Sequence, residues 1–417
     1  MLGGSLRSSR ASVVLVGCIV FVVALIGLAY SHLESWQFPV SSSPNSRIPD
    51  GSVPNVKHDA VASHVTPQGS ASDHPVPAAA ALTTDERLRE FYLTNMFKPS
   101  VAPDSPTFKP RDAFEWNLTE KARWQQPMRE NLCIIDLDNR KFDEAGQVFG
   151  PAAMDWGSAH GVHGLSLGLL NHYVYARIHG YKYYYVNIVE PQDRRASWKK
   201  PSVISKILKE HDVCIYLDSD AIFRNLDLPF EWLMNYWKLY PDNNAMALAE
   251  DPAFNYNKDK FGKLYLNTGF IVSQNNPTTY KIMDDWDKCP NDNGPYPGCE
   301  GFRRSWPGQP TDQGGFGTYV RYNYTAHIRE LPCTEANGFP LSESTCHGTF
   351  IRHLWTGKDN QIKIDVGQQL PGPFLRIFHE EYVRQRGTFY MEEADLLARG
   401  PSEALRGGEF KGGVVSF

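Results

Sequence analysis

The sequence predicts an α/β domain in which a Rossmann-like, mostly parallel sheet is flanked by helices. Two observations predict it. Short apolar runs alternate with segments of helical spacing from Asn131 onward. These runs are apolar at nearly every position, and such strands are typical of parallel sheets that are covered on both faces. Ligands bind to sheets of this kind at the carboxyl ends of the strands, so a functional site is expected there.

The predicted elements follow one another in the order strand, helix, strand, helix, strand. The first helix has apolar or aromatic residues at helical intervals and is followed by Gly180, which is a helix stop signal. No G-x-G-x-x-G motif follows the first strand, which disfavours a dinucleotide cofactor. The elements are Leu132–Leu137, Gly164–His179, Tyr181–Val189, Pro201–Glu210 and Val213–Leu217.

The composition is that of a globular protein. Hydrophobic residues make up 41% and aromatic residues 12% of the 417 residues. A chain of this length can form two ordinary domains or one large α/β domain with extensions. The formal net charge of -5 provides no basic surface, so nucleic acid is not an expected partner.

The N-terminal region contains a candidate membrane anchor. The run Ala11–Tyr30 is uncharged and long enough to cross a bilayer as a helix. Arg7 and Arg10 precede it, and the next Lys or Arg is Arg47. The positive-inside rule therefore places the short tail in the cytosol and the rest of the chain in a lumen. A signal peptide that is cleaved near Ala29 is the alternative.

The remaining segments differ in composition. Residues 31–84 are rich in Ser, Pro and Ala without a sustained apolar period, which predicts a disordered stalk. The predicted organisation is a cytosolic tail at 1–10, the anchor at 11–30, the stalk at 31–84, a helical or extended lead-in at 85–130, the α/β domain at 131–395 and a C-terminal tail at 396–417.

The cysteines fit an oxidising compartment. Two pairs each enclose a short loop and are predicted to form local disulfides. Two further cysteines lie in predicted strands, where they are either packed thiols or bonded to each other. No C-x-x-C pair occurs, which disfavours zinc. The local pairs are Cys289 with Cys299 and Cys333 with Cys346, and the strand cysteines are Cys133 and Cys214.

Two aspartates follow the third predicted strand, in the stretch Y-L-D-S-D-A. Side chains alternate across a strand, so Asp218 and Asp220 project to one side and Ser219 to the other. Two neighbouring carboxylates repel each other unless a cation lies between them, and Mg²⁺ or Mn²⁺ prefers such oxygen ligands. The pair therefore predicts a divalent metal site. Ordinary capping of a turn by Asp is the alternative.

The ordered motifs W-K-K-P, Y-L-D-S-D-A, L-N-T-G-F, D-Q and R-H-L-W-T-G-K resemble those of GT-A-fold glycosyltransferases of the secretory pathway. They are most similar to the fungal galactosyltransferase and mannosyltransferase family, to which plant xyloglucan xylosyltransferases are related. The resemblance covers roughly Asn131–Tyr382. It implies that residues 131–395 form a GT-A catalytic domain, and it implies a nucleotide diphosphate sugar and a glycan acceptor as substrates.

The resemblance also implies roles for individual residues. Asp218, Asp220 and His353 correspond to the metal ligands, with Mn²⁺ or Mg²⁺ as the cofactor. Asp218 also corresponds to a donor-binding residue. Local alternatives remain for several of these residues, such as a core histidine, a solvated lysine or a glycine bulge in a strand. The other donor-binding candidates are Lys199, for which Lys200 is an alternative, Asn267, Thr268, Gly269, Gly357 and Lys358.

Asp312 and Gln313, in T-D-Q-G-G, are the candidate catalytic residues. The similar family transfers with retention of anomeric configuration, which implies that no strong base is needed. The Gln313 amide would then support the donor while Asp312 binds sugar hydroxyls. In an inverting enzyme, Asp312 would instead be the general base. A helix N-cap at Asp312 is the non-catalytic alternative.

These inferences predict a metal-dependent, retaining hexosyltransferase that uses a galactosyl or mannosyl donor. The predicted location is the Golgi membrane, in single-pass type II orientation with a lumenal catalytic domain. A transferase complex or a homo-oligomer is compatible with this interpretation. Two alternatives are a noncatalytic lumenal protein that binds glycans or assembles complexes, and a hydrolase of nucleotide sugars.

Overall fold

The computed structural model describes residues 82–95, 98–110, 114–152, 154–158, 161–304, 310–369 and 372–399. All of these belong to one compact unit, Pro77–Phe417. The predicted cytosolic tail, the predicted anchor at 11–30, most of the predicted stalk and most of the C-terminal tail lie outside the described residues. Within the described ranges, no helix combines the length and the apolar character needed to span a bilayer.

The centre of the described chain is a mixed sheet of seven strands. Four neighbouring pairs are parallel, namely β11 with β4, β4 with β3, β3 with β5 and β7 with β9. Strand β8 runs antiparallel to both β5 and β7. In spatial order the strands are β11 (Tyr390–Glu392), β4 (Lys182–Asn187), β3 (Leu132–Asp138), β5 (Val213–Leu217), β8 (Leu266–Gln274), β7 (Met246–Glu250) and β9 (Ile328–Leu331).

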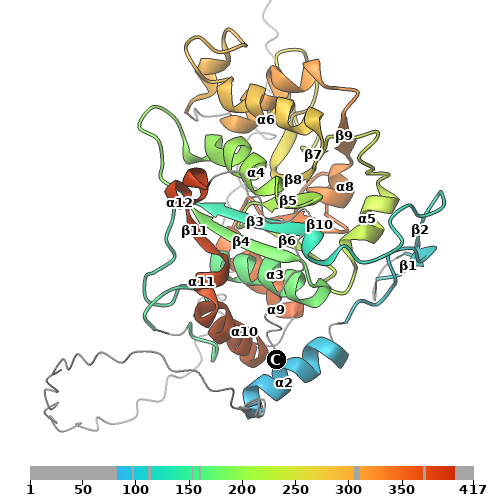
Figure 1. The fold of residues 1–417 in the computed structure, drawn as a ribbon, viewed down its shortest axis with the longest axis vertical. Helices are drawn as coiled ribbons and strands as arrows, with labels where there is room; N and C mark the ends of the chain where they lie inside the picture. Colours follow the sequence, from blue (N-terminus) through green and yellow to red (C-terminus); the bar gives the residue numbers. More distant parts are fainter. Residues whose placement is uncertain are drawn as a thin grey trace, which may run out of the picture. The chain divides into compact units, whose positions relative to one another are not determined.

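Helices cover both faces of this sheet (Figure 1), as the apolar strands predicted. Every residue of β3 is buried, and its side chains alternate between two cores. Ile134 packs in one core with α3, α9 and α10, and Ile135 packs in the other with α4 and α6. These helices are α3 (Gly164–His179), α4 (Lys200–Leu208), α6 (Pro277–Lys288), α9 (Lys358–Gln369) and α10 (Gly372–Arg384).

The remaining elements are two small strand pairs and further helices. Strands β1 (Thr107–Phe108) and β2 (Trp116–Asn117) form a small antiparallel pair, and so do β6 (Ala221–Phe223) and β10 (Ile351–His353). The other α-helices are α2 (Thr84–Asn95), α5 (Phe230–Tyr236), α7 (Asp312–Thr318), α8 (Cys333–Ala336), α11 (Arg386–Phe389) and α12 (Glu393–Ala398).

The predicted element order is confirmed, with shifts of boundary. Helix α3 and strand β5 have the predicted bounds, and Gly180 ends α3 in the left-handed region at φ 74°. Strand β4 and helix α4 are shorter than predicted, because the strand-like and helical patterns continue into the adjoining turns. The class is therefore α/β, and the antiparallel β8 makes the sheet mixed.

Three disulfides join the six cysteines of the described chain. The two predicted local pairs are confirmed as Cys289–Cys299 and Cys333–Cys346. The pair for which two interpretations remained, Cys133 and Cys214, is a disulfide. These two residues are direct neighbours in the parallel pairing of β3 with β5, with Cα atoms 4.5 Å apart. The bond therefore joins the two strands whose ends carry the candidate site.

Helix α3 supports the turn between Asp218 and Asp220 through close backbone packing. A Cβ atom at Gly168 would lie 1.9 Å from the Ser219 carbonyl oxygen. We expect Gly168→Ala to force this turn away from α3 and to lower the free energy of unfolding by about 1–3 kcal/mol, as overpacking does. Urea denaturation measures this change.

The matched control is Gly367→Ala in α9. Apart from the helix's own backbone, no described atom lies within 4 Å of the Cβ position at Gly367, so the alanine adds helix propensity without a clash. Equal stability of the two variants would contradict the close packing at Gly168.

Candidate active site

The candidate site forms where strands of both directions meet at one edge of the sheet. Strand β5 ends at Leu217, which leads directly into Asp218. Because β8 is antiparallel to β5, its first residues lie beside this end, and the Asp218 amide donates to the Gly269 carbonyl over 2.8 Å. Strand β7 is antiparallel to β8 and therefore ends at the same edge, just before Asp251. Three distant chain segments are thus brought together.

His353 reaches the two aspartates through a second, smaller sheet. After the aspartates the chain enters β6, which pairs with β10 so that Ala221 lies opposite His353. The His353 Nε2 atom is 3.5 Å from Asp220 Oδ1 and 3.9 Å from Asp218 Oδ2. One ligand atom from each of the three residues lies within 4.8 Å of the others. The structure therefore brings together the three predicted metal ligands.

These three residues fit a divalent cation. One imidazole nitrogen with two carboxylates is a donor set that suits Mn²⁺. The Nδ1 atom of His353 is 3.0 Å from Asn337 Oδ1, an acceptor that requires the proton on Nδ1 and leaves the Nε2 lone pair toward the carboxylates. The buried Asp220 Oδ2 atom forms an ion pair with the Lys358 Nζ atom, 2.6 Å away.

The electrostatics of the cluster favour an ionised Asp220. Burial opposes ionisation of Asp220, but the neighbouring His353 and Lys358 outweigh it and lower the pKa of this carboxyl. Burial likewise opposes the charged form of His353, but Asp220 and then Asp218 raise the pKa of its imidazole. A carboxylate that stays ionised is a competent metal ligand.

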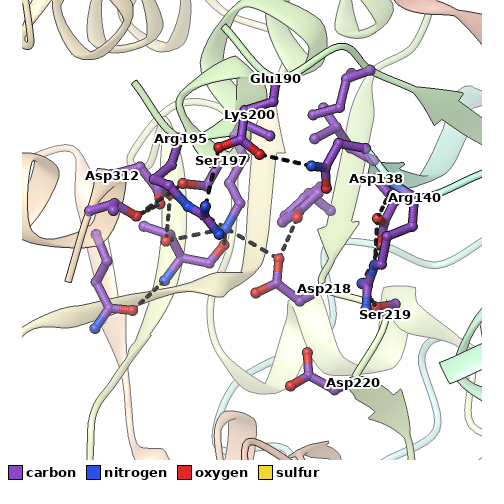
Figure 2. Close-up of a pocket in the computed structure, with 18 of the residues that line it drawn as sticks. Asp138, Arg140, Glu190, Arg195, Ser197, Lys200, Asp218, Ser219, Asp220 and Asp312 are labelled. Carbon is purple, nitrogen blue, oxygen red and sulfur yellow. Dashed lines mark hydrogen bonds and ion pairs between the residues drawn. The ribbon is translucent and has the colours of Figure 1, made fainter. Parts of the chain in front are cut away.

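The site opens into a cavity of about 610 Å³. Figure 2 shows Asp138 and Arg140 on one side of it, Lys200 and Asp312 on the other, and Asp218 and Asp220 between them. The lining residues are Leu137, Asp138, Asn139, Arg140, Ile188, Glu190, Arg195, Ala196, Ser197, Lys200, Tyr216, Asp218, Ser219, Asp220, Thr268, Pro310, Thr311, Asp312, Gln313 and Lys358.

The structure brings Lys200 to the cavity, whereas Lys199 points elsewhere. The Lys200 Nζ atom is buried 3.2 Å from Asp218 Oδ1 and 3.4 Å from Asp312 Oδ2. Burial opposes its charge, but Asp218 and Asp312 raise the pKa of Lys200. Lys199 instead pairs with Glu393 in α12 at 2.6 Å. Adjacent residues at a helix start face different directions, so the motif W-K-K-P did not distinguish them.

Of the predicted N-T-G segment, only Thr268 lines the cavity. The Asn267 side chain is turned inward, where its Nδ2 atom donates to Asp251 over 2.8 Å and its Oδ1 atom accepts from the Gly269 amide over 2.7 Å. A Cβ atom at Gly269 would lie 2.3 Å from His353 Cε1. The glycine therefore leaves room for the imidazole, and neither flanking residue contacts the cavity.

Asp312 and Gln313 both line the cavity, at the first turn of α7. Asp312 is 3% exposed. Its carboxylate accepts hydrogen bonds from the hydroxyls of Thr268 and Thr311, each over 2.9 Å. The Gln313 Oε1 atom accepts from the Thr268 amide over 3.3 Å, while its Nε2 atom donates to Asp251 over 2.5 Å. Asp312 is thus engaged by two hydroxyls and the Lys200 ammonium.

Lys358 lines the cavity, and Gly357 does not. Gly357 precedes α9 with φ 59°, a left-handed conformation that favours glycine. This conformation ends the extended segment after β10 and directs Lys358 back toward Asp220. The glycine therefore positions the lysine, and its own backbone is outside the cavity lining.

Arg140 is a charged lining residue that the sequence analysis missed. Its guanidinium donates to both oxygens of Asp138, over 2.8 and 2.5 Å, and to Ser219 Oγ over 2.9 Å. Its side chain is 50% exposed, which leaves donors available to a ligand. The signal was the charged triplet D-N-R directly after the first strand, at the edge where ligands bind.

A comparison with protein families agrees with the resemblance seen in the motifs. Residues 165–294 match the model of the galactosyl transferase GMA12/MNN10 family. This match indicates that the chain is a glycosyltransferase. The matched segment of the transferase includes Asp218, Asp220 and Thr268, whereas Asp312 and His353 lie outside it. The predicted resemblance and the transferase class are confirmed.

Two solved structures are similar to parts of the transferase. A glycosyltransferase involved in the glycosylation of the major capsid of PBCV-1 is 14% identical, with 57% of this chain and 99% of that chain covered and a TM-score of 0.38. Mouse xyloside xylosyltransferase 1 is 10% identical, with 54% and 98% covered and a TM-score of 0.32. At TM-scores this low, neither structure adds to the assignment. No curated protein matches the sequence.

The two lysines of the W-K-K-P motif provide a test of the site geometry. Lys200→Met leaves Asp218 and Asp312 without their shared ammonium, so we expect a loss of about 3–5 kcal/mol in the free energy of unfolding. Lys199→Met removes an ion pair whose lysine is partly exposed while its partner Glu393 is buried, and is expected to cost about 1–2 kcal/mol. Urea unfolding of both variants measures the difference, and a larger effect at Lys199 would contradict the arrangement.

Proposed function

We propose that this transferase is a metal-dependent, retaining hexosyltransferase that moves galactose or mannose from a nucleotide diphosphate sugar to a glycan acceptor. The observation that carries the proposal is the position of the Asp218, Asp220 and His353 cluster on the cavity that Asp312 and Gln313 also line. Metal ligands and candidate sugar-binding groups thus face one space. A cavity of about 610 Å³ is within the size range of small-molecule sites.

In the proposed reaction, Asp218, Asp220 and His353 hold Mn²⁺ or Mg²⁺. The cation would supply Lewis acidity toward the departing nucleoside diphosphate. Lys358 and Arg140 border the same space and provide further positive charge for phosphate oxygens. Asp312 and Gln313 lie on the Thr268 side of the cavity, where we place the donor sugar.

The surroundings of Asp312 support a reaction that retains the anomeric configuration. A general base for an inverting reaction must be free to accept a proton from the acceptor hydroxyl. The Asp312 carboxylate is buried, and Lys200 together with two hydroxyls contacts it. These donors already contact both of its carboxylate oxygens. We therefore assign it to orienting the sugar and not to deprotonation.

We also propose that the enzyme acts in the lumen of the Golgi as a single-pass type II membrane protein. The uncharged run at 11–30, preceded by Arg7 and Arg10, supports an anchor in this orientation. The three disulfides support an oxidising compartment for the domain.

Transfer is tested by incubating the full-length protein with Mn²⁺, a panel of nucleotide sugars and oligosaccharide acceptors. We expect acceptor-dependent nucleotide release that chelation of the metal abolishes. Asp220→Ala is expected to lower the rate by about 100-fold or more, since it removes a ligand of the cation that would stabilise the charge developing on the leaving diphosphate. The control is Asp242→Asn, an exposed aspartate that pairs with Arg123, which should leave the rate unchanged.

The possible results of this assay separate the alternatives. Release that does not depend on acceptor identifies a nucleotide-sugar hydrolase. Absence of metal-dependent donor binding in the wild-type protein contradicts both enzymatic functions and favours a noncatalytic glycan-binding role.

The anomeric configuration of the product tests retention. With an α-linked donor we expect an α-linked product, which proton NMR coupling constants of the anomeric centre reveal. A β-linked product would show inversion and would make Asp312 the general base.

A further inference from the structure

Asp251 forms the centre of a buried group of amide side chains behind the candidate metal site. It is the first residue after β7 and is 6% exposed. Its Oδ1 atom accepts from Asn267 Nδ2 over 2.8 Å and from Asn337 Nδ2 over 3.1 Å. Its Oδ2 atom accepts from Gln313 Nε2 over 2.5 Å. Three amides from three separate segments thus donate to one carboxylate.

A carboxylate fixes the orientation of each amide that contacts it. An ionised carboxylate only accepts hydrogen bonds, so each amide must turn its NH₂ group toward Asp251 and its oxygen away. Burial raises the pKa of Asp251, while the three amide donors favour its charged form. The charge of His353 also lowers the pKa of Asp251, and Asp251 does not line the cavity. Its contacts point to positioning and not to direct binding.

The orientation of Asn337 reaches the metal cluster. Because Asn337 Nδ2 faces Asp251, its Oδ1 atom faces His353 Nδ1 at 3.0 Å. A carbonyl oxygen at this position requires a proton on Nδ1 of the imidazole. The Nε2 atom, 3.5 Å from Asp220 Oδ1, then has the free lone pair that a metal ligand needs.

The opposite orientation of the Asn337 amide would prevent His353 from binding a metal through Nε2. If Asn337 turned its NH₂ group toward His353, Nδ1 would have to accept, and the proton of the neutral ring would move to Nε2. The nitrogen that faces the aspartates would then lack a lone pair. Asn337 Oδ1 and Nδ2 are alike in size, so the two orientations differ only in hydrogen bonding. Asp251 and the Glu250 carbonyl, which also accepts from Asn337 Nδ2 over 3.1 Å, favour the observed one.

We propose that Asp251 is a positioning residue that selects the metal-binding tautomer of His353 through Asn337. The same carboxylate orients Gln313, so that Gln313 Oε1 faces the Thr268 amide at the cavity. One buried charge therefore sets both the metal ligand and a candidate catalytic amide. This inference rests on the proposed function, because it assigns His353 to a divalent cation.

The direct test is Asp251→Asn, which keeps the size of the side chain and adds a donor. We expect Mn²⁺ affinity to fall by about 10–100-fold, the usual effect of changing a group that orients a metal ligand. Calorimetry or electron paramagnetic resonance of the full-length protein with Mn²⁺ alone measures the affinity without any turnover. The KM for the donor is expected to rise at limiting Mn²⁺ and to recover in part at saturating Mn²⁺.

A double variant tests whether Mn²⁺ affinity can be restored. In Asp251→Asn with Asn337→Asp, residue 337 only accepts, so His353 must again donate from Nδ1. The new amide at 251 can donate to it. We expect Mn²⁺ affinity to recover in part, because Asn337 Nδ2 also donates to the Glu250 carbonyl over 3.1 Å and that bond is lost. A purely structural role of Asp251 would give no recovery.

The matched control is Asp259→Asn, another buried carboxylate in the connection between β7 and β8. Asp259 accepts from the backbone amides of Phe261 and Lys263 and pairs with Arg321, away from the cluster. This variant is expected to lose stability and to keep its Mn²⁺ affinity.

The outcomes separate this inference from the proposed function. If the wild-type protein does not bind Mn²⁺, the proposed function fails. If the wild-type protein binds Mn²⁺ and Asp251→Asn binds it equally well, only the role of Asp251 is overturned. If Asp251→Asn does not fold, the wild-type protein still provides a test. In ¹⁵N NMR of the metal-free protein, recorded above the pKa of the His353 imidazole, the spectrum shows which ring nitrogen carries the proton. A proton on His353 Nδ1 supports the inference, and a proton on Nε2 overturns it.

Discussion

The arrangement of this site depends on the repulsion between two carboxylates that stand one residue apart at the end of a buried strand. Asp218 and Asp220 cannot both stay ionised there without nearby positive charge. Lys200 compensates Asp218 and Lys358 compensates Asp220, while the proposed cation held with the His353 imidazole would add further positive charge. These three groups come from α4, α9 and β10, so the charge of one short turn is balanced by groups from three separate elements at the same edge of the sheet.

The antiparallel strand β8 makes this convergence possible. A wholly parallel sheet would deliver only strand ends to the β5 edge, each followed by a crossover helix. Because β8 enters at this edge and β7 leaves at it, Thr268 and Asp251 lie beside the aspartates. The close packing of Gly168 against Ser219 holds the turn from the α3 side, and the Cys133–Cys214 bond joins β3 to β5 near the opposite ends of these strands. The local geometry is therefore fixed from both faces.

The parts of the site that the sequence predicted are those that local patterns encode. Asp218 and Asp220 follow a strand that is recognisable by its apolar run, and the Cys289 and Cys333 loops close over short spans. Lys199 and Lys200 show the limit of prediction from sequence, because a motif does not indicate which of two adjacent residues at a helix start faces the site. Their roles separate only when Glu393 and Asp312, far away in sequence, supply different partners.

The sequence alone was sufficient for the α/β class, the order of the elements and the chemistry expected at the β5 edge. Strand periodicity, helix stop signals and acidic pairs are short-range properties of a chain. The tertiary structure alone decided that Asn267 and Gly269 face the interior and that Asp251 and Asn337 stand behind His353. These are contacts between segments up to 86 residues apart, and no local pattern records which distant amide will meet a buried carboxylate.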